Sequence, residues 1–217
     1  MEIHFTINGH QWNGTRVAPW QMFRNKELVT LLALNAVLNI TLGFNYSFFP
    51  LYYKQVGGGS VLLGVAMFLT GISEIPFLLF AEKILNRLGI RKTLLLSNTA
   101  AGIRWLLLYL VADRYAVLAV SLMHGLTFII FSYSLATYIN REVPRELRAS
   151  GQTTAALVSG FARVIGSMGG GVLCEMAGVR QGYFYSFLIN FAALAAFGAF
   201  FYLTAQNKKD GAISKVD

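Results

Sequence analysis

The sequence predicts an all-α membrane protein with six transmembrane helices, and three observations support this fold class. Fifty-five per cent of the 217 residues are hydrophobic and only 13% are charged, whereas charged residues make up about a quarter of a soluble domain. The mean hydropathy is +0.54. A bilayer span takes about 20 apolar residues, and six apolar stretches of roughly this length follow one another along the chain.

The chain divides into an N-terminal segment, a transmembrane domain and a polar tail. Residues 1–27 are mixed and polar and contain no apolar run, so they are not a secretory signal peptide. Short polar separators divide residues 28–205 into spans, and residues 206–217 form the tail. Hydropathy places the spans at residues 28–53, 60–85, 93–112, 115–139, 149–173 and 182–205.

Lysine and arginine residues segregate strongly across the predicted spans. Only Lys54, Arg114 and Arg180 fall on one side, and Arg104 and Arg163 fall inside spans. The other side carries the remaining basic residues and both termini, which places the termini in the cytoplasm by the positive-inside tendency. The net charge of +8 therefore follows from membrane topology, and we exclude a nucleic-acid-binding surface. The basic residues of this side are Arg16, Arg24, Lys26, Lys83, Arg87, Arg91, Lys92, Arg141, Arg145, Arg148, Lys208, Lys209 and Lys215.

The sequence offers no set of metal ligands and no motif for an organic cofactor. Cys174 is the only cysteine, which excludes an intrachain disulfide and a cysteine-cluster metal site. His4 and His10 are too isolated along the chain to indicate a metal site. We therefore predict neither a metal nor a cofactor.

Four ionisable residues lie deep inside the predicted spans, away from the span ends, namely Glu74, Arg104, His124 and Arg163. Such a group at the bilayer centre costs about 2.5–3.5 kcal/mol on insertion scales, so it indicates a function. With a rise of about 1.5 Å per residue, Glu74 and Arg104 both lie about 16 Å from the cytoplasmic face, on consecutive antiparallel helices. We therefore predict an ion pair between them.

Further polar or small residues share the helix faces that carry these four groups, and a fifth polar face lies on the first span. We predict that five such faces converge on one cavity and form a hydrated path through the membrane. Asn35 and Asn39, on the first span, belong to this path. The other residues on these faces are Tyr46, Met67, Thr70, Phe77, Ala81, Ser97, Thr127, Phe128, Phe131, Tyr138, Gln152, Ser159, Gly166 and Gly170.

Purely structural interpretations of the same residues stay open. A buried Glu–Arg pair can simply lock two helices together, and His124 can hydrogen-bond a neighbouring helix. Asn35 and Asn39 suit interhelical hydrogen bonds, and the glycines at positions 166, 169, 170 and 171 suit close helix packing. A glycine run inside a span, with no Lys-Ser or Lys-Thr pair after it, is a poor phosphate-binding loop.

The connection between the second and third predicted spans carries the motif Asn86-Arg87-Leu88-Gly89-Ile90-Arg91-Lys92. It resembles the basic loop signature of the major facilitator superfamily, in which glycine permits a tight turn and the basic residues contact helix ends. With five further motifs it resembles the C-terminal six-helix half of the lactose-permease and phenylpropionate-permease-like branch, from about Leu28 to Leu203. These motifs are Ile72-Ser73-Glu74-Ile75-Pro76, Arg104-Trp105, His124-Gly125-Leu126-Thr127-Phe128, Glu142-Val143-Pro144 and Gly166-Ser167-Met168-Gly169-Gly170.

The resemblance implies roles for three of the ionisable residues. In lactose-permease-like symporters the corresponding helices carry a glutamate, an arginine and a histidine that act in sugar binding and proton coupling. These roles fall on Glu74, Arg104 and His124. Those symporters have a second carboxylate one turn after the histidine, where this chain has Thr127. If the chain couples transport to protons, we therefore expect Glu74 to carry the proton. His124, or a carboxylate from outside this set of residues, would take part as well. The role of Arg163 stays open.

The resemblance also implies a fold and a partner. Superfamily members have twelve helices in two halves with the substrate site between them, and this chain corresponds to one half, a 3+3 inverted repeat. We expect a plasma-membrane, proton-coupled half-transporter for a sugar, nucleoside or aromatic acid, paired with an N-terminal half or a second copy. The alternatives are an intramembrane enzyme acting on lipid head groups and a non-transporting remnant or subunit. The sequence leaves open the substrate, the direction of transport, and whether the chain is a fragment, a split-gene half or a homodimeric half.

Overall fold

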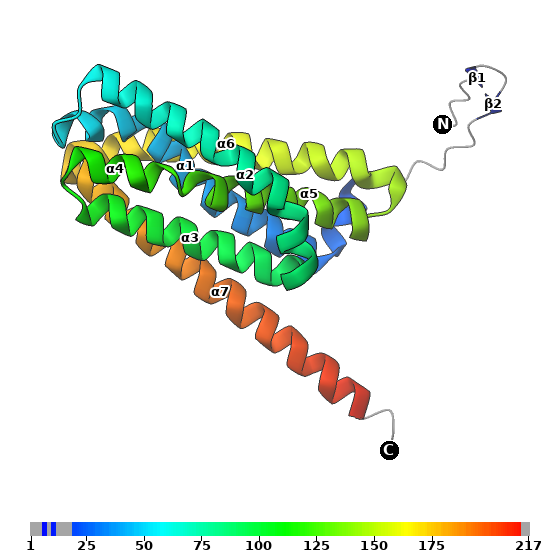
Figure 1. Cartoon of the computed structure of the whole chain (residues 1–217). Coiled ribbons are helices and arrows are strands. Elements are labelled where there is room, and N and C mark those ends of the chain that lie inside the picture. Colours follow the sequence, from blue (N-terminus) through cyan, green and yellow to red (C-terminus); the bar gives the residue numbers. More distant parts are fainter. Residues whose placement is uncertain (1–5, 8–9, 12–18, 214–217) are drawn as a thin grey trace.

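The protein is a bundle of long helices (Figure 1). Its structure, a computed structural model, describes residues 6–7, 10–11 and 19–213. Six helical segments are long and apolar enough to cross a bilayer, which confirms the predicted fold class. In chain order the elements are β1 (Thr6–Ile7), β2 (His10–Gln11), η1 (Pro19–Arg24), α1 (Lys26–Gln55), α2 (Ser60–Leu88), α3 (Ile90–Leu110), α4 (Arg114–Ser121), η2 (Gly125–Ile129), α5 (Ile130–Glu142), η3 (Arg145–Leu147), α6 (Arg148–Ala177) and α7 (Val179–Ile213).

The observed helices begin and end within a few residues of most predicted spans. The last helix is the exception, because α7 continues to Ile213, past the predicted end of the domain at residue 205. Residues 214–217 of the predicted tail and much of the predicted N-terminal segment lie outside the described residues. Within that segment, β1 and β2 form a short antiparallel pair in which Thr6 lies opposite Gln11.

Local sequence explains where the helices begin and turn. The Asn25 side chain caps α1, because its Oδ1 accepts hydrogen bonds from the N–H groups of Glu27 and Leu28 at 3.0 and 3.2 Å. Asp113 caps α4 in the same way. Gly89 joins α2 to α3 with a φ of 77°, in the left-handed region that favours glycine. The tight turn predicted for the basic loop motif is therefore present.

Helix α1 packs against both α6 and α7 and is the most buried of the spans. Two glycines allow α1 and α6 to approach closely. A Cβ on Gly43 would collide with the backbone of Arg163, and a Cβ on Gly166 would collide with the backbone of Ile40. Close packing therefore accounts for Gly166, whereas a Cβ on Gly169 would meet nothing within 4 Å.

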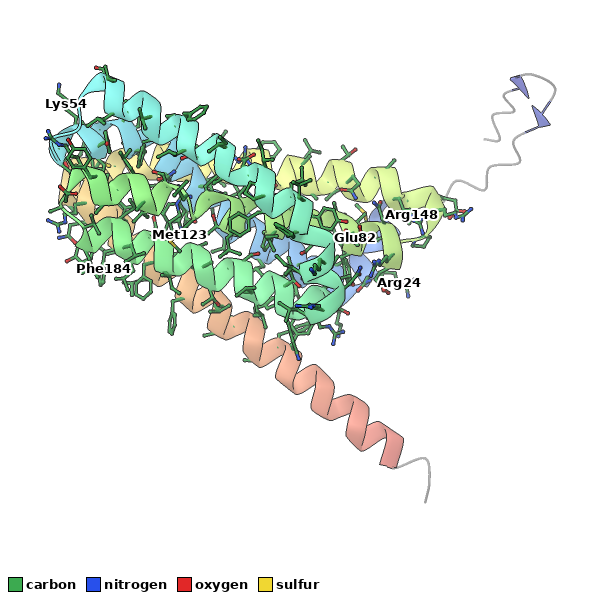
Figure 2. The ribbon with its side chains drawn as sticks, in the orientation of Figure 1. Arg24, Lys54, Glu82, Met123, Arg148 and Phe184 are labelled. Atoms are coloured by element: carbon green, nitrogen blue, oxygen red, sulfur yellow. The ribbon has the colours of Figure 1, made fainter. Side chains whose placement is uncertain are left out.

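The two ends of the bundle differ in charge. Figure 2 shows Arg24 and Arg148 at one end and Lys54 and Phe184 at the other. We call the first the basic end. Its described basic residues are Arg24, Lys26, Lys83, Arg87, Arg91, Lys92, Arg141, Arg145 and Arg148.

The fourth span departs from the single continuous helix expected at residues 115–139. Helix α4 ends at Ser121, and the π-helix η2 (Gly125–Ile129) precedes α5. Figure 2 labels Met123, which lies in this break near the middle of the bundle. Turns of π-helix are rare and occur often at functional sites. This one follows His124 directly.

Candidate functional site

Three ionisable residues from three different spans meet beside the break in the fourth span. Nη1 of Arg104, on α3, lies 2.9 Å from Nδ1 of His124. On the other side of the imidazole, Nε2 lies 3.3 Å from Oε1 of Glu74, on α2. Arg104 and His124 are only 2% and 1% exposed. The convergence of these three residues, which the predicted path required, is therefore present in the structure.

The predicted direct ion pair between Glu74 and Arg104 is wrong. The imidazole of His124 contacts both side chains, and the ion pairs among the described residues do not include one that joins Glu74 to Arg104. The prediction used the depth of Glu74 and Arg104 alone. Equal depth does not show which side chain lies between two others, and here the imidazole of His124 lies between them.

The contact with Arg104 fixes where His124 carries its proton. A guanidinium group has donors and no acceptor, so Nδ1 of His124 must accept the hydrogen bond from Nη1 of Arg104. The ring proton then lies on Nε2. There it faces Oε1 of Glu74 at 3.3 Å and the hydroxyl of Tyr46 at 3.2 Å. While Arg104 keeps this contact, His124 is neutral and donates from Nε2.

A second polar network links α1 to α6. Nε of Arg163 donates to Oδ1 of Asn39 at 2.9 Å. Nδ2 of Asn39 in turn donates to the backbone oxygen and to Oδ1 of Asn35 at 2.8 and 2.9 Å. Nδ2 of Asn35 donates to Oγ of Ser159 at 2.8 Å. Asn35 and Asn39 therefore do form hydrogen bonds between helices, and the same bonds orient the Arg163 side chain.

Two aromatic rings connect the two networks. The guanidinium carbon of Arg163 lies 5.7 Å from the ring centre of Tyr46 and 5.5 Å from that of Phe128. These distances are within the range of cation–π attraction. The imidazole of His124 stacks on Phe128 with ring centres 5.5 Å apart and an angle of 20°. All six predicted site residues within the spans thus belong to one group of contacting residues, which we call the connected set. The connected set consists of Asn35, Asn39, Tyr46, Glu74, Arg104, His124, Phe128 and Arg163.

This connected set reaches the surface of the bundle on one side. The side chain of Glu74 is 36% exposed, Tyr46 is exposed and Arg163 is half-buried. Arg104 and His124 lie behind them, fully buried. A solute or a second protein surface that approaches this side meets a carboxylate, a phenol and a guanidinium group first.

The charges of this set do not balance. It contains two arginines, one glutamate and a histidine that the hydrogen bonds hold neutral. Nε of Arg104 is buried and has no hydrogen-bond partner among the described residues. A buried cation without a carboxylate is costly. The arrangement therefore favours a ligand or a neighbouring surface that supplies negative charge or hydroxyl groups.

A third buried polar cluster, which the sequence did not predict, joins α1, α3 and α7. Oγ1 of Thr41 accepts from Nε1 of Trp105 at 3.2 Å and from Nδ2 of Asn190 at 2.9 Å. The hydroxyl of Tyr183 donates to Oδ1 of Asn45 at 3.1 Å. Asparagines inside apolar runs were the available signal. The prediction included only Asn35 and Asn39, which share a helix face with Tyr46 on the first span.

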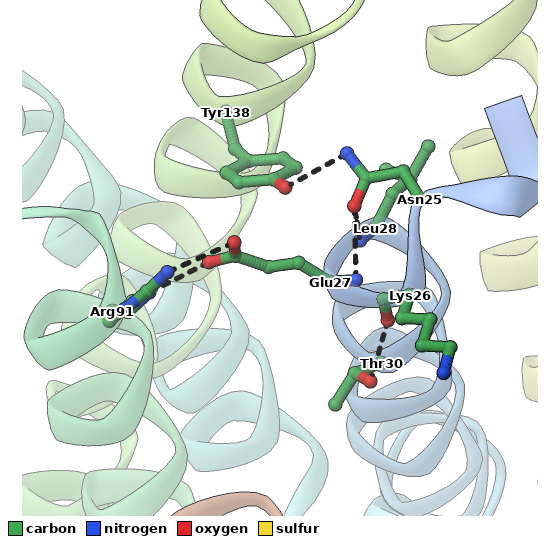
Figure 3. A network of polar contacts seen from close by, with 7 residues as sticks. All are labelled: Asn25, Lys26, Glu27, Leu28, Thr30, Arg91 and Tyr138. Carbon is green, nitrogen blue, oxygen red and sulfur yellow. Dashed lines mark hydrogen bonds and ion pairs between the residues drawn. The ribbon is translucent and has the colours of Figure 1, made fainter. Parts of the chain in front are cut away.

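The basic loop motif is tied to the start of α1 (Figure 3). Nε and Nη2 of Arg91 donate to the two carboxylate oxygens of Glu27 at 2.7 and 3.0 Å. The guanidinium of Arg91 also lies 4.7 Å from the ring centre of Phe201. Asn25, which caps α1, donates to the hydroxyl of Tyr138 at 3.4 Å. The other predicted members of the motif, Asn86, Arg87 and Lys92, are exposed.

A comparison with protein families agrees with three features of this structure. These are the six spans, the glycine turn followed by basic residues, and the ionisable side chains at the middle of the bundle. The model of the MFS_1 like family matches residues 5–186. The chain belongs to this family. The predicted resemblance to the major facilitator superfamily is thereby confirmed. The similar proteins described next are named as transporters and not as enzymes that act on lipid head groups.

Several curated proteins of this kind are similar in sequence. The uncharacterized transporter YwbF of Bacillus subtilis is 26% identical over 76% of this chain and 41% of its own length. The putative nucleoside transporter YegT of Escherichia coli is 28% identical over 82% of this chain and 43% of its own. A maltose permease of Geobacillus stearothermophilus is 26% identical, with coverages of 70% and 38%. The chain thus spans less than half the length of each relative.

Solved structures give the same result for the fold. A crystal structure of a mutant form of the nucleoside transporter NupG matches with a TM-score of 0.72 at 20% identity, over 83% of this chain and 50% of that chain. A second NupG structure matches with a TM-score of 0.66 at 21% identity. At this level of identity the likeness concerns the fold alone. The six-helix bundle corresponds to half of a larger transporter fold.

Proposed function

We propose that this chain is the C-terminal six-helix half of a proton-coupled secondary transporter that moves a small organic solute by alternating access. The observation that carries the proposal is the convergence of Glu74, His124 and Arg104, together with Arg163, at the middle of a membrane-spanning bundle. Ionisable residues at this depth are characteristic of solute and proton pathways. The relatives named as transporters support the same function.

In the proposed mechanism Glu74 carries the coupling proton. The ionised carboxylate accepts from Nε2 of His124, and the imidazole in turn accepts from Arg104. Protonation removes the negative charge from Glu74 and weakens its hold on the imidazole. Arg104 is then free to bind an anionic or hydroxyl-bearing solute, with His124 and Asn39 as further hydrogen-bonding groups. Loss of the proton on the other side of the membrane restores the original contacts and releases the solute.

A nucleoside is the solute that we propose first. Its sugar hydroxyls suit the hydrogen-bonding groups of Arg104, Arg163 and Asn39, and its base suits stacking on an aromatic ring such as Phe128 or Tyr46. The name of YegT as a putative nucleoside transporter supports this class. Sugars come second, because one relative is a maltose permease, and aromatic acids come third.

We further propose that a second six-helix half covers the side on which the connected set opens. Helices α2 and α6 bury few of their residues within this bundle, and a half on its own would leave Glu74 and Arg163 against lipid, at a cost of about 2.5–3.5 kcal/mol for each charged group. An N-terminal half or a second copy would remove this cost. The excess of Lys and Arg at the basic end supports a plasma-membrane orientation with both termini cytoplasmic.

Co-expression with a candidate partner half, followed by uptake assays with labelled nucleosides, sugars and aromatic acids, tests the function. In an active pair we expect Glu74→Gln to abolish proton-driven accumulation and to keep solute exchange, because an amide cannot release a proton. Glu82→Gln is the matched control, since Glu82 lies on the same helix and is exposed. Uphill uptake that survives Glu74→Gln unchanged would contradict the proton role. No pH-dependent uptake with any partner would favour a non-transporting subunit.

A further inference from the structure

Helix α2 packs along the fourth span, and at the break two consecutive residues on each side contact one another. The backbone N–H of Gly125 donates to Oγ of Ser73 at 3.1 Å. The next residue on α2, Glu74, contacts the preceding residue of the fourth span, His124. A backbone contact thus lies beside the side-chain contact on which the proposed mechanism depends.

Two hydrogen bonds fix the orientation of the Ser73 hydroxyl, one that it donates and one that it accepts. It donates to the backbone oxygen of Thr70 at 2.7 Å and accepts from the N–H of Gly125. A hydroxyl has a single hydrogen to donate, so this pair of contacts uses its donor and directs a lone pair at Gly125. Ser73 is only 5% exposed, which excludes most competition from solvent.

Only glycine fits at position 125. A Cβ there would collide with the backbone oxygen of Ser73, and it would lie 2.5 Å from the ring of Phe77. The absence of a side chain therefore lets the start of the π-helix lie directly against the α2 backbone. Close backbone approach of this kind is a common use of glycine between membrane helices.

The π-helix fixes the placement of two rings of the connected set. His124 precedes η2 and Phe128 lies within it, stacked on the imidazole and beneath the guanidinium of Arg163. Conversion of this turn to regular α-helix would change the register by one residue. Such a change rotates a side chain by about 100° around the helix axis, which would take His124 away from Arg104 and Glu74.

We propose that Ser73 and Gly125 are positioning residues that hold the π-helix in register and thereby keep His124 between Arg104 and Glu74. The importance of this position for transport depends on the proposed function, whereas the docking of the fourth span on α2 does not. Without the Ser73 hydroxyl, the segment loses its hydrogen bond to α2, and the imidazole is no longer confined to the single tautomer that the Arg104 contact requires.

The histidine ring nitrogens report this position without any transport assay. Replacing His4 and His10 with Gln leaves His124 as the only histidine of the full chain, which is then labelled with ¹⁵N-histidine and reconstituted in lipid nanodiscs. We expect the parent chain to show one neutral tautomer, protonated at Nε2. Ser73→Ala is expected to give a several-fold drop in the ratio of the Nε2-protonated to the Nδ1-protonated form, because one buried hydrogen bond is lost.

Two further variants decide between positioning and a general loss of structure. Ser73→Thr keeps the hydroxyl and is expected to restore the spectrum of the parent chain. Ser134→Ala is the matched control, because Ser134 is also buried and its hydroxyl, among the described residues, bonds only to the Ile130 carbonyl of its own helix at 2.7 Å. We expect it to leave the tautomer unchanged.

The proposal is overturned if Ser73→Ala gives the spectrum of the parent chain, or if Ser134→Ala changes the tautomer ratio as much as Ser73→Ala does. The proposed function is tested separately by uptake. A chain that shows the expected tautomers but no pH-dependent uptake with any partner half would contradict the transport proposal and leave the positioning role in place.

Discussion

Arg91 and Arg104 lie on the same helix, α3, in opposite surroundings. Arg91 is at the basic end, with a side chain that is 47% exposed, and it makes a two-pronged ion pair with Glu27. Arg104 is buried, contacts a neutral imidazole and leaves its Nε without a partner among the described residues. The exposed arginine is paired with a carboxylate, and the buried one is not. A bundle selected only for stability would have the reverse arrangement, so the difference indicates that Arg104 serves another purpose.

The largest expected effect comes from replacing Arg104. Arg104→Leu removes a hydrogen bond from a charged group to the solute, worth about 1.5–3 kcal/mol, which corresponds to a rise of about 10- to 140-fold in the KM for uptake. Arg91→Leu is the matched control on the same helix, and we expect it to change the KM by less than about twofold because exposed ion pairs contribute little. Uptake kinetics in the co-expressed pair measure both.

The thermal stability of the Arg104→Leu variant sharpens the comparison. Because Arg104 has no carboxylate partner, its replacement with leucine is expected to leave the melting temperature unchanged or to raise it. If Arg104 only locks helices together, the melting temperature would fall instead. Thermal unfolding in detergent, followed by the intrinsic fluorescence of tryptophan, separates these outcomes without a transport assay.

The glycine contact between α1 and α6 gives an intermediate effect. Gly166→Ala places a methyl group against the backbone of Ile40, and overpacking of this kind costs about 1–3 kcal/mol. Gly169→Ala is the control on the same helix, where the methyl group meets nothing within 4 Å. We expect a lower unfolding midpoint for the first variant only. Equal midpoints would show that α6 can shift to relieve the contact.

The smallest effect is expected at the basic end. A double-mutant cycle with Glu27→Gln and Arg91→Gln should give a coupling energy of about 0.2–1 kcal/mol, the range of exposed ion pairs. The coupling should decrease further in 1 M salt, where charges are screened within about 3 Å. A coupling well above this range would mean that the pair is shielded, and it would weaken the contrast between Arg91 and Arg104.

The comparison also shows how far the sequence could predict this site. The cost of burying charge was enough to select Glu74, Arg104, His124 and Arg163, because an ionisable residue inside an apolar run is visible without any structure. Helical phase was enough to place Asn39 with them. It could not show that His124 lies between Glu74 and Arg104, because a regular helix was assumed through the fourth span and a π-helix has no clear sequence signature.

The partners of these residues were harder to predict for a related reason. Ser73 and Gly125 each lie beside a predicted residue, yet their contact crosses between two helices whose rotation and spacing the sequence does not encode locally. The cluster of Thr41, Trp105 and Asn190 was missed because uncharged polar residues are common in spans and serve mostly as links between helices. Only the packed bundle shows which of them meet.

By itself, the sequence determined the number of spans, the two chemically different ends of the bundle and the residues that carry charge into the membrane. These features follow from the free energy of placing each side chain in water or in hydrocarbon, which is a property of local composition. The tertiary structure alone decided that His124 lies between Glu74 and Arg104, that Arg163 faces Phe128 and that Arg104 has no acidic partner within the described chain. Those contacts depend on helix rotation, on the close approach that glycines permit and on one irregular turn, all of which arise only when the helices pack together.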